Sequence, residues 1–205
     1  MNSDLLKAAQ RKLLVWPDGV WGPQTHEAFL RYNPKDEVSG VDSENPPWVT
    51  ELLKVFGWHE VRDNARLRAW LKSDNETLGD PAALPWCGDA AETAMKLALP
   101  DEPFPGNLGI NPYWARNWAG FGRAALGFGT IGVFERGPKS GHVGFLVGYD
   151  DANYHVLGGN QGDRVSVVPI DKDRLLASRW PVTFETDPRP LPRRTSIMPV
   201  SVNEI

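Results

Sequence analysis

The sequence predicts an α+β protein in which helices come first and an antiparallel sheet follows. Helical spacing of apolar residues extends to about residue 118, and β-rich segments follow at short intervals from residue 131. A glycine-rich region separates the two halves. A run of helices followed by closely spaced strands is typical of α+β proteins with an antiparallel sheet.

A small helical segment with a linker is predicted over residues 1–46. Ser3 and Thr25 are suitable N-caps for two short helices, and Asp18-Gly19 provides the turn between them. Two helices of this length bury too little surface to be stable alone, so they need a partner surface. Residues 33–47 are polar and contain Pro and Gly, which is typical of a linker.

The main domain is expected over residues 47–181, and its first half is predicted to be helical. Apolar spacing indicates helices around residues 48–56, 67–71 and 87–98, with a further short helix around residues 114–118. The stripe on the third helix consists of Cys87, Ala90, Ala91, Ala94, Met95 and Ala98. Because small residues dominate this stripe, we expect the helix to press closely against a sheet.

Four strands are predicted after these helices, over residues 131–134, 142–149, 154–157 and 165–168. Alternation along the second strand puts His142 and Gly144 on one face and Val143 on the other. Beyond Trp180-Pro181 the chain is rich in proline and polar residues. We expect this tail, residues 182–205, to be mobile.

Composition excludes several classes of partner. The 22 Lys+Arg and 26 Asp+Glu give a net charge of −4 without a basic run, so nothing favours a nucleic-acid phosphate backbone. No apolar stretch approaches the roughly 18 residues of a membrane span. The first residues lack the basic and apolar regions of a signal peptide, so we expect synthesis in the cytoplasm without membrane insertion. No heptad pattern appears, and a monomer is expected.

The single cysteine is the first candidate for chemistry. One cysteine forms no internal disulfide and no Cys-rich zinc site, and no H-E-x-x-H spacing occurs, so no metal or cofactor is expected. Cys87 is predicted at the first turn of its helix, where free N–H groups and the helix dipole lower a thiol pKa. The alternative is a thiol that only fills the core.

A histidine and an amide complete the predicted site. We expect the helix terminus to pack on the face of His142, where Gly144 leaves room, so that the imidazole acts as the base for Cys87. Asn160 follows the next strand and is the candidate that orients the imidazole. Gln161 points to the other face of an extended strand and is predicted to contact substrate or a loop. The histidines at positions 26, 59 and 155 are weaker candidates for the base.

Several blocks of the chain resemble the papain-like cell-wall hydrolases of the NlpC/P60 and CHAP superfamily. These blocks are Trp48, Gly57, Glu60, Asn64, Pro85-Trp86-Cys87-Gly88, Trp118, Gly122, Arg136-Gly137, Gly141-His142-Val143-Gly144-Phe145 and Leu157-Gly158-Gly159-Asn160-Gln161. The resemblance spans roughly residues 47–181. It implies a papain-like fold with Cys87 as nucleophile, His142 as base and Asn160 as the orienting group.

The resemblance also implies a reaction. It is the cleavage of an amide bond in the stem or cross-link peptides of bacterial peptidoglycan, through a thioester on Cys87 and without a cofactor. The activity would be that of a cysteine endopeptidase or an N-acetylmuramoyl-L-alanine amidase. Trp86 and Trp118 are candidates for the walls of the substrate groove, and core packing is the alternative reading of both residues.

Residues 18–29 resemble the signature of the helical peptidoglycan-binding domain found beside many wall hydrolases. This resemblance implies wall binding through Trp21 and Thr25, and the alternative is a helical hairpin that packs on the main domain. Together the two resemblances imply a phage endolysin, released through a membrane pore to act on the wall in the periplasm. Two alternatives stay open: an injected antibacterial effector of the same chemistry, and a non-catalytic wall-binding protein with a packed Cys87.

Overall fold

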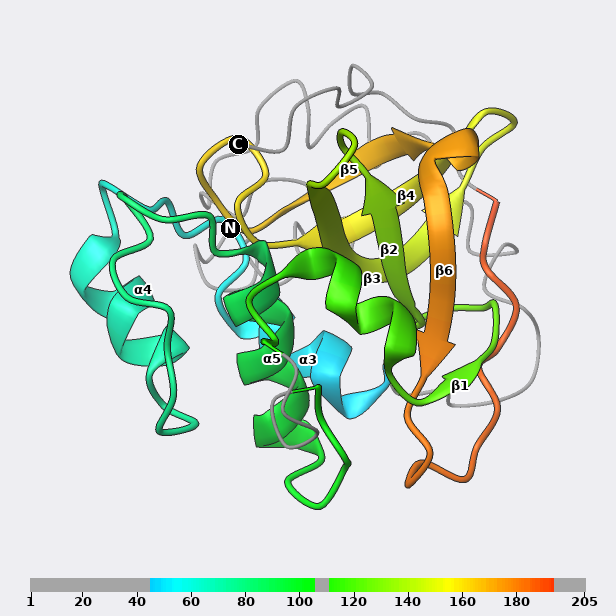
Figure 1. The fold of residues 1–205 in the computed structure, drawn as a ribbon, viewed down its shortest axis with the longest axis horizontal. Helices are drawn as coiled ribbons and strands as arrows, with labels where there is room; N and C mark the ends of the chain where they lie inside the picture. The colour runs from blue at the N-terminus through cyan, green and yellow to red at the C-terminus, as the bar shows by residue number, and fades with distance from the viewer. Residues whose placement is uncertain (1–44, 106–110, 194–205) are drawn as a thin grey trace, which may run out of the picture. The chain divides into compact units, whose positions relative to one another are not determined.

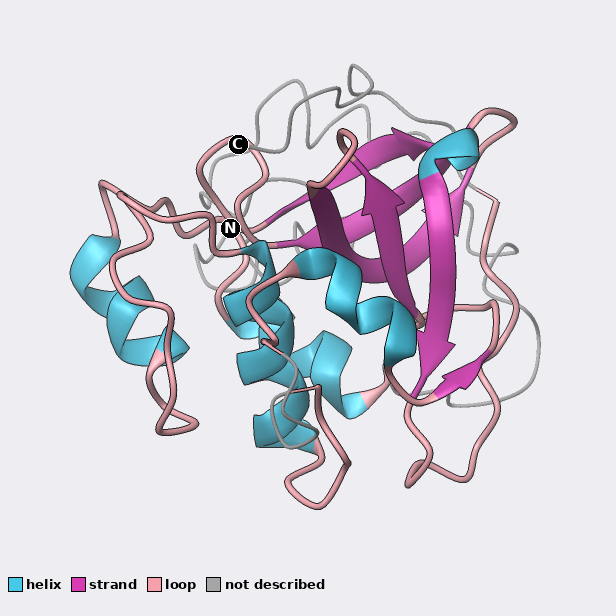
Figure 2. Ribbon diagram, viewed as in Figure 1, coloured by secondary structure: helices cyan, strands magenta, loops and turns pink. Residues whose placement is uncertain are grey.

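The computed structural model describes residues 45–105 and 111–193. In this part helices precede a six-stranded antiparallel sheet, which confirms the α+β class (Figures 1 and 2). The elements in chain order are α3 (Pro47–Lys54), α4 (Asn64–Leu71), α5 (Cys87–Ala98), the 3-10 helix η3 (Ala115–Gly120), β1 (Arg123–Ala124), β2 (Ile131–Glu135), β3 (Gly141–Tyr149), β4 (Asn153–Gly158), β5 (Ser166–Asp171), the 3-10 helix η4 (Lys172–Arg174) and β6 (Leu175–Trp180).

The sheet has the strand order β1-β6-β2-β3-β4-β5, and each neighbouring pair is antiparallel. The predicted strands correspond to β2 to β5, although β5 begins one residue later than predicted and extends to Asp171. The sequence pattern does not predict β1 or β6. Residues 175–180 are mostly half-buried on both faces, so β6 lacks the alternation that marks a strand with one solvated face.

Helix α5 packs closely on the sheet, as its small residues predict. Ala90 and Ala94 are fully buried. Gly159, just after β4, approaches the helix so closely that a Cβ at this position would lie 2.6 Å from the Cβ of Ala90. Figure 1 shows α3 beside α5, with α4 on the side of α5 away from the sheet. Small side chains therefore set the separation between the helix and the end of β4.

Trp48 ties helix α3 to the sheet. Its indole N–H donates to the carbonyl of Gly129 at 2.7 Å, and its ring packs edge-on against Trp180 at 4.9 Å. Pro46 and Pro47 at the start of α3 suit a helix N-terminus, because the first N–H groups have no intrahelical partner. The helix is thereby fixed at the end of the sheet opposite to the start of β3.

The other face of the sheet carries a second apolar cluster. Its buried members are Phe134, Leu146, Val156 and Ile170, and Leu191 packs against them from the C-terminal segment. Residues 182–193, within the predicted mobile tail, make specific hydrogen bonds. The buried carboxylate of Glu102 accepts from the backbone N–H of Val182 at 2.7 Å and of Thr183 at 2.8 Å.

Two predicted features lie outside the described residues. The wall-binding segment, with Trp21 and Thr25, falls before residue 45, and the end of the chain from residue 194 also lies beyond this range. Within residues 45–105 and 111–193, no helix has the length and apolar character that a bilayer crossing requires.

Asp150 closes the turn between β3 and β4 and makes the stability of the fold depend on pH. Its carboxylate accepts from the N–H groups of Ala152 at 3.0 Å and Asn153 at 2.8 Å, and it lies 2.9 Å from His155 Nε2. Burial opposes ionisation, but these hydrogen bonds outweigh it and lower the pKa from 3.8 to about 2. A lowered carboxyl pKa stabilises the folded state above pH 3.8, and this stabilisation is lost as the pH falls toward 2.

We expect protonation of the Asp150 carboxylate to lower the free energy of unfolding by about 2 kcal/mol as the pH falls from about 5 to about 2. Denaturant unfolding of the Asp150→Asn variant measures it, and the variant should lose stability less steeply over this range. Asp151→Asn, at the neighbouring and more exposed carboxylate, is the control and should keep the wild-type slope. An unchanged slope in Asp150→Asn would contradict the assignment.

Candidate active site

Cys87 is the first residue of helix α5, and the chain on both sides holds it in place. The indole of the preceding Trp86 donates to Glu60 Oε2 at 2.8 Å. On the other side, the carbonyl of Tyr113 lies where a Cβ on Gly88 would come within 2.6 Å of it, so only glycine fits there without a shift. The thiol is therefore enclosed, and Cys87 is only 6% exposed.

Burial and the neighbouring polar groups have opposite effects on the pKa of the Cys87 thiol. Burial raises the pKa of Cys87 above its ordinary value of 9.0, and this is the largest influence. The backbone N–H groups of Val143 and Gly88 and the charge of Arg136 favour the thiolate but do not outweigh burial. The predicted net lowering of the thiol pKa is therefore wrong: the N–H groups at the helix terminus act in the predicted direction, but burial removes the solvent that would stabilise a thiolate and outweighs them.

His142 lies in strand β3, fully buried, and its ring bonds to a side-chain amide. Nε2 of the imidazole is 2.8 Å from Oε1 of Gln161. The amide nitrogen of Gln161 donates to the carbonyl of Ser166 at 2.6 Å and to that of Val156 at 3.2 Å. Because both amide donors point to carbonyls, the oxygen of Gln161 must face His142, and the neutral imidazole carries its proton on Nε2.

The amide that meets His142 is therefore Gln161, not the predicted Asn160. Asn160 is buried and has a φ of 56°, in the left-handed region. This conformation ends the alternation of strand β4 and turns the chain, so that Gln161 lies on the side of His142. The prediction assumed an extended strand through Gln161, and that assumption gave the two amides the wrong directions.

Helix α5 lies on the other face of β3 from the one predicted. His142 pairs with Phe134, which belongs to the apolar cluster on the face away from the helix. Gly144 shares that face, and a Cβ there would meet Val156 Cγ1 at 2.7 Å rather than the helix. The thiol instead reaches β3 through the backbone N–H of Val143, the residue after His142. The Cys87 sulfur thus meets β3 at the residue that follows His142 in the chain.

The predicted groove walls, Trp86 and Trp118, belong to the core. Both are buried, and the indole N–H of Trp118 donates to the carbonyl of Pro112 at 2.8 Å. The aromatic side chain that is exposed near the site is Trp114, which is 51% exposed. It follows Tyr113 directly, and its indole donates to the carbonyl of Lys139 at 3.2 Å. The sequence pattern does not single out Trp114, because the pattern of a predicted helix does not show that one of its aromatic residues is exposed.

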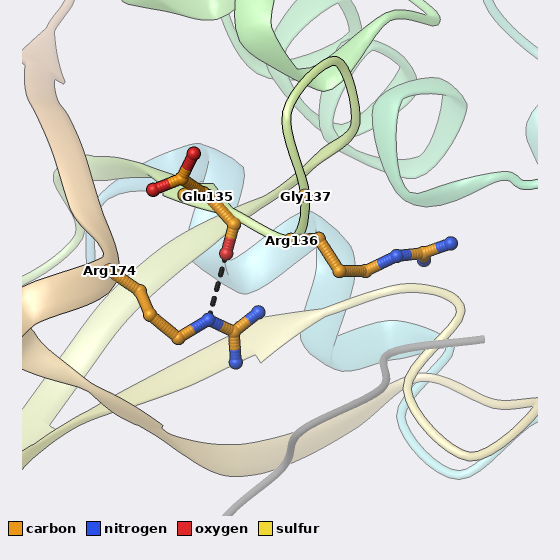
Figure 3. Close-up of a pocket in the computed structure, with 4 residues that line it drawn as sticks. All are labelled: Glu135, Arg136, Gly137 and Arg174. Atoms are coloured by element: carbon orange, nitrogen blue, oxygen red, sulfur yellow. Dashed lines mark hydrogen bonds between the residues drawn. The ribbon is translucent and has the colours of Figure 1, made fainter.

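The turn between β2 and β3 brings positive charge to the site. Residues 136–140 form this turn, in which the N–H of Arg136 donates to the carbonyl of Ser140 at 3.3 Å. Arg116 of η3 holds it from the side by donating to Ser140 O at 2.8 Å and to Gly137 O. A cavity of about 280 Å³ adjoins the turn and is lined by Glu135, Arg136, Gly137 and Arg174 (Figure 3).

The remaining histidine candidates lie in other settings. His155 faces Asp150 at the far end of the β3–β4 hairpin, and Nδ1 of His59 accepts from the N–H of Val61 at 3.1 Å. His26 lies outside the described residues. Within the described ranges, no group of three or more His, Cys, Asp or Glu side chains has the arrangement of a metal site.

Alkylation of Cys87, the only cysteine, tests its environment directly. We expect iodoacetamide at about pH 8 to modify the folded protein at least about tenfold more slowly than the urea-unfolded chain, because burial restricts access and raises the thiol pKa. Arg136→Gln should slow the reaction further, whereas Lys139→Gln, at an exposed position in the same turn, should not. Equal rates for folded and unfolded chains would contradict a buried, protonated thiol.

Comparisons with known proteins return no relative. No family model, no curated protein and no solved structure matches this chain.

Proposed function

We propose that this protein is a papain-like cysteine hydrolase that cleaves an amide bond of peptidoglycan, with Cys87 as nucleophile, His142 as base and Gln161 as the orienting group. One observation carries the proposal. The Gln161 amide fixes the His142 ring beside the stretch of β3 whose N–H contacts the Cys87 sulfur. A nucleophile, a base and a group that orients the base are the parts that covalent catalysis by cysteine requires.

The tautomer of His142 defines which atom acts as the base. Because Gln161 Oε1 accepts the Nε2 proton, the lone pair of the neutral ring is on Nδ1. Nδ1 is the ring nitrogen closer to the main chain of β3, where the N–H of Val143 contacts the thiol. Nδ1 therefore takes the Cys87 proton, and the Gln161 oxygen stabilises the imidazolium that forms.

Two covalent steps follow from this assignment. The sulfur attacks the amide carbonyl, and N–H groups at the start of α5 stabilise the oxyanion. The C–N bond then breaks, the amine leaves with the proton from Nδ1, and a thioester remains on Cys87. Water attacks the thioester carbonyl while Nδ1 accepts its proton, the C–S bond then breaks, the acid product leaves, and Nδ1 returns the proton to the Cys87 sulfur. Because burial raises the pKa of Cys87, the resting thiol is protonated, so the base is needed for the first step.

The substrate class comes from the sequence resemblance. Peptidoglycan stem or cross-link peptides are the substrates that the NlpC/P60 and CHAP resemblance implies, and the activity is that of an endopeptidase or an N-acetylmuramoyl-L-alanine amidase. A phage endolysin is the biological role we favour, with an injected antibacterial effector as the alternative. An adjacent holin gene would support the first role and an adjacent immunity gene the second.

One observation favours a second candidate, a non-catalytic wall-binding protein. Cys87 is buried and its pKa is raised, as is typical of a thiol that fills a core. In that case the His142 to Gln161 bond would serve only to satisfy two buried polar groups. Activity of the Cys87 variants separates the two candidates.

Replacement of the nucleophile is the decisive test. We expect purified wild type to release soluble muropeptides from bacterial sacculi and Cys87→Ala to lower the rate by about 10³-fold or more, because no other group can form the thioester. Mass spectrometry of the muropeptides identifies the bond that is cut. Cys87→Ala should retain the wild-type melting temperature within a few degrees. Clearance by Cys87→Ala at the wild-type rate would rule out the nucleophile.

A matched pair of amide variants tests the orienting group. Gln161→Ala should lower kcat by about 10- to 100-fold, because the imidazole loses the acceptor that fixes its tautomer. Asn160→Gly retains the left-handed backbone and should change kcat by less than about threefold. Nitrogen-15 NMR of His142 should show the Nε2–H tautomer in wild type and its loss in Gln161→Ala. A larger loss of kcat in Asn160→Gly than in Gln161→Ala would instead assign the orienting role to Asn160.

A further inference from the structure

One exposed aromatic side chain has no part in the catalytic steps proposed above. Trp114 is 51% exposed, whereas the tryptophans of the core are at most 1% exposed; these are Trp48, Trp86, Trp118 and Trp180. Its indole N–H donates to the carbonyl of Lys139 at 3.2 Å, so its one polar atom already has a partner. The ring therefore presents a flat apolar surface that a hydrogen bond holds in place, and binding a ligand on it costs little side-chain entropy.

The chain on both sides of Trp114 contacts residues next to the proposed nucleophile and base. The carbonyl of Tyr113 would lie 2.6 Å from a Cβ on Gly88, the residue that follows the nucleophile. The Cβ of Ala115 would lie 3.7 Å from a Cβ on Gly141, the residue that precedes the base. Trp114 therefore lies between two contacts with the chain around the site. A substrate that occupied the site would have a neighbouring group within reach of this ring.

The charges near Trp114 favour a neutral ligand over a cationic one. Lys139, whose carbonyl accepts the indole hydrogen bond, has an exposed side chain. Arg116 lies two residues from Trp114 in the chain, and the carboxylate of Glu135, 3.1 Å from its Nη2, balances its charge. The face of an indole can bind a cation, but the remaining positive charge of Lys139 opposes an ammonium group there.

Among the components of peptidoglycan, the saccharide rings fit this surface best. The stem peptides of the proposed substrate carry methyl groups, carboxylates and an ammonium group, none of which is both flat and apolar. A pyranose ring has a flat face of C–H groups that can cover an indole while its hydroxyl groups stay in water. The exposed ring of Trp114 thus favours a substrate whose saccharide lies next to the site, rather than one that is cut at a distant cross-link.

We propose that Trp114 stacks on the muramic acid ring of the glycan strand and thereby places at Cys87 the amide that joins this sugar to the stem peptide. This proposal rests on the proposed hydrolase function and names the bond that is cut. The thioester then forms on the lactyl carbonyl of muramic acid, and the C–N bond to L-alanine breaks. The stem peptide takes the proton from His142 and leaves with a free amino terminus, and water hydrolyses the thioester.

Two defined substrates provide the test: a disaccharide tetrapeptide, and a cross-linked dimer of stem peptides without saccharide. For the full-length wild type we expect mass spectrometry to show the disaccharide separated from an intact tetrapeptide, with little cleavage of the dimer. Trp114→Ala should raise KM on the disaccharide tetrapeptide by about 10- to 100-fold with a smaller change in kcat, because the stacking contact forms before the reaction begins. Trp114→Phe retains an aromatic ring and should keep KM within about fivefold of wild type.

Leu126→Ala is the matched control for loss of an exposed apolar side chain. Leu126 is 56% exposed and lines a cavity with Tyr149, at the opposite end of β3 from His142. This variant should keep the wild-type KM and kcat. Because Trp114 is half-exposed, Trp114→Ala should keep the wild-type melting temperature within a few degrees.

Calorimetric binding of the disaccharide tetrapeptide to Cys87→Ala gives a readout that does not depend on catalysis, and adding Trp114→Ala should weaken binding by about 10-fold or more. Unchanged binding and KM in the Trp114 variants, with cleavage that still requires Cys87, would overturn the saccharide contact and leave the hydrolase function intact. Trp114-dependent cleavage of the peptide dimer would also overturn it, by showing that the ring binds peptide. Trp114-dependent binding by a wild type that cleaves neither substrate nor sacculi would instead overturn the hydrolase function and the assigned bond.

Discussion

The hydrogen bond between Gln161 and His142 is the constraint on which the candidate site depends. Both residues are buried, so an unmade bond would leave two polar groups without compensation for lost water. The Gln161 amide makes three hydrogen bonds. Its oxygen accepts from His142, and its nitrogen donates to the carbonyls of Val156 in β4 and Ser166 at the start of β5. Two neighbouring strands thus determine the orientation of one imidazole ring, which then has a defined proton acceptor.

The environment of Cys87 is a balance between desolvation and nearby donors. A fully solvated thiol at a helix terminus would ionise more readily, but Cys87 is only 6% exposed, and the carbonyls of Pro112 and Tyr113 lie close against the neighbouring Gly88. The N–H groups of Gly88 and Val143 and the charge of Arg136 act against this effect without reversing it. In the proposed hydrolase function, a thiol with a raised pKa needs the base for the first step. In the second candidate function, the same burial would simply be core packing.

Much of the fold follows from local sequence patterns. Small residues at helical spacing predict α5 and its close contact with the sheet, and the β-branched and aromatic segments predict β2 to β5. Strand β6 was not predicted because it is half-buried along most of its length, and β1 because two residues carry no periodicity. Residues 182–193 have the composition of a mobile tail, yet Glu102 and the apolar cluster hold them through contacts distant in sequence.

The sequence by itself determined the chemical groups of the site: one cysteine at a helix start, one histidine in a strand and one amide pair after the next strand. Only the tertiary structure decided which amide meets the histidine, which face of β3 the helix covers and how strongly burial acts on the thiol. The physical reason is that alternation along a strand fixes side-chain direction only while the backbone remains extended. The backbone is no longer extended at Asn160, which has a left-handed conformation, so alternation does not predict the direction of Gln161. Burial of the thiol depends on segments distant in the chain, so no local pattern encodes its pKa.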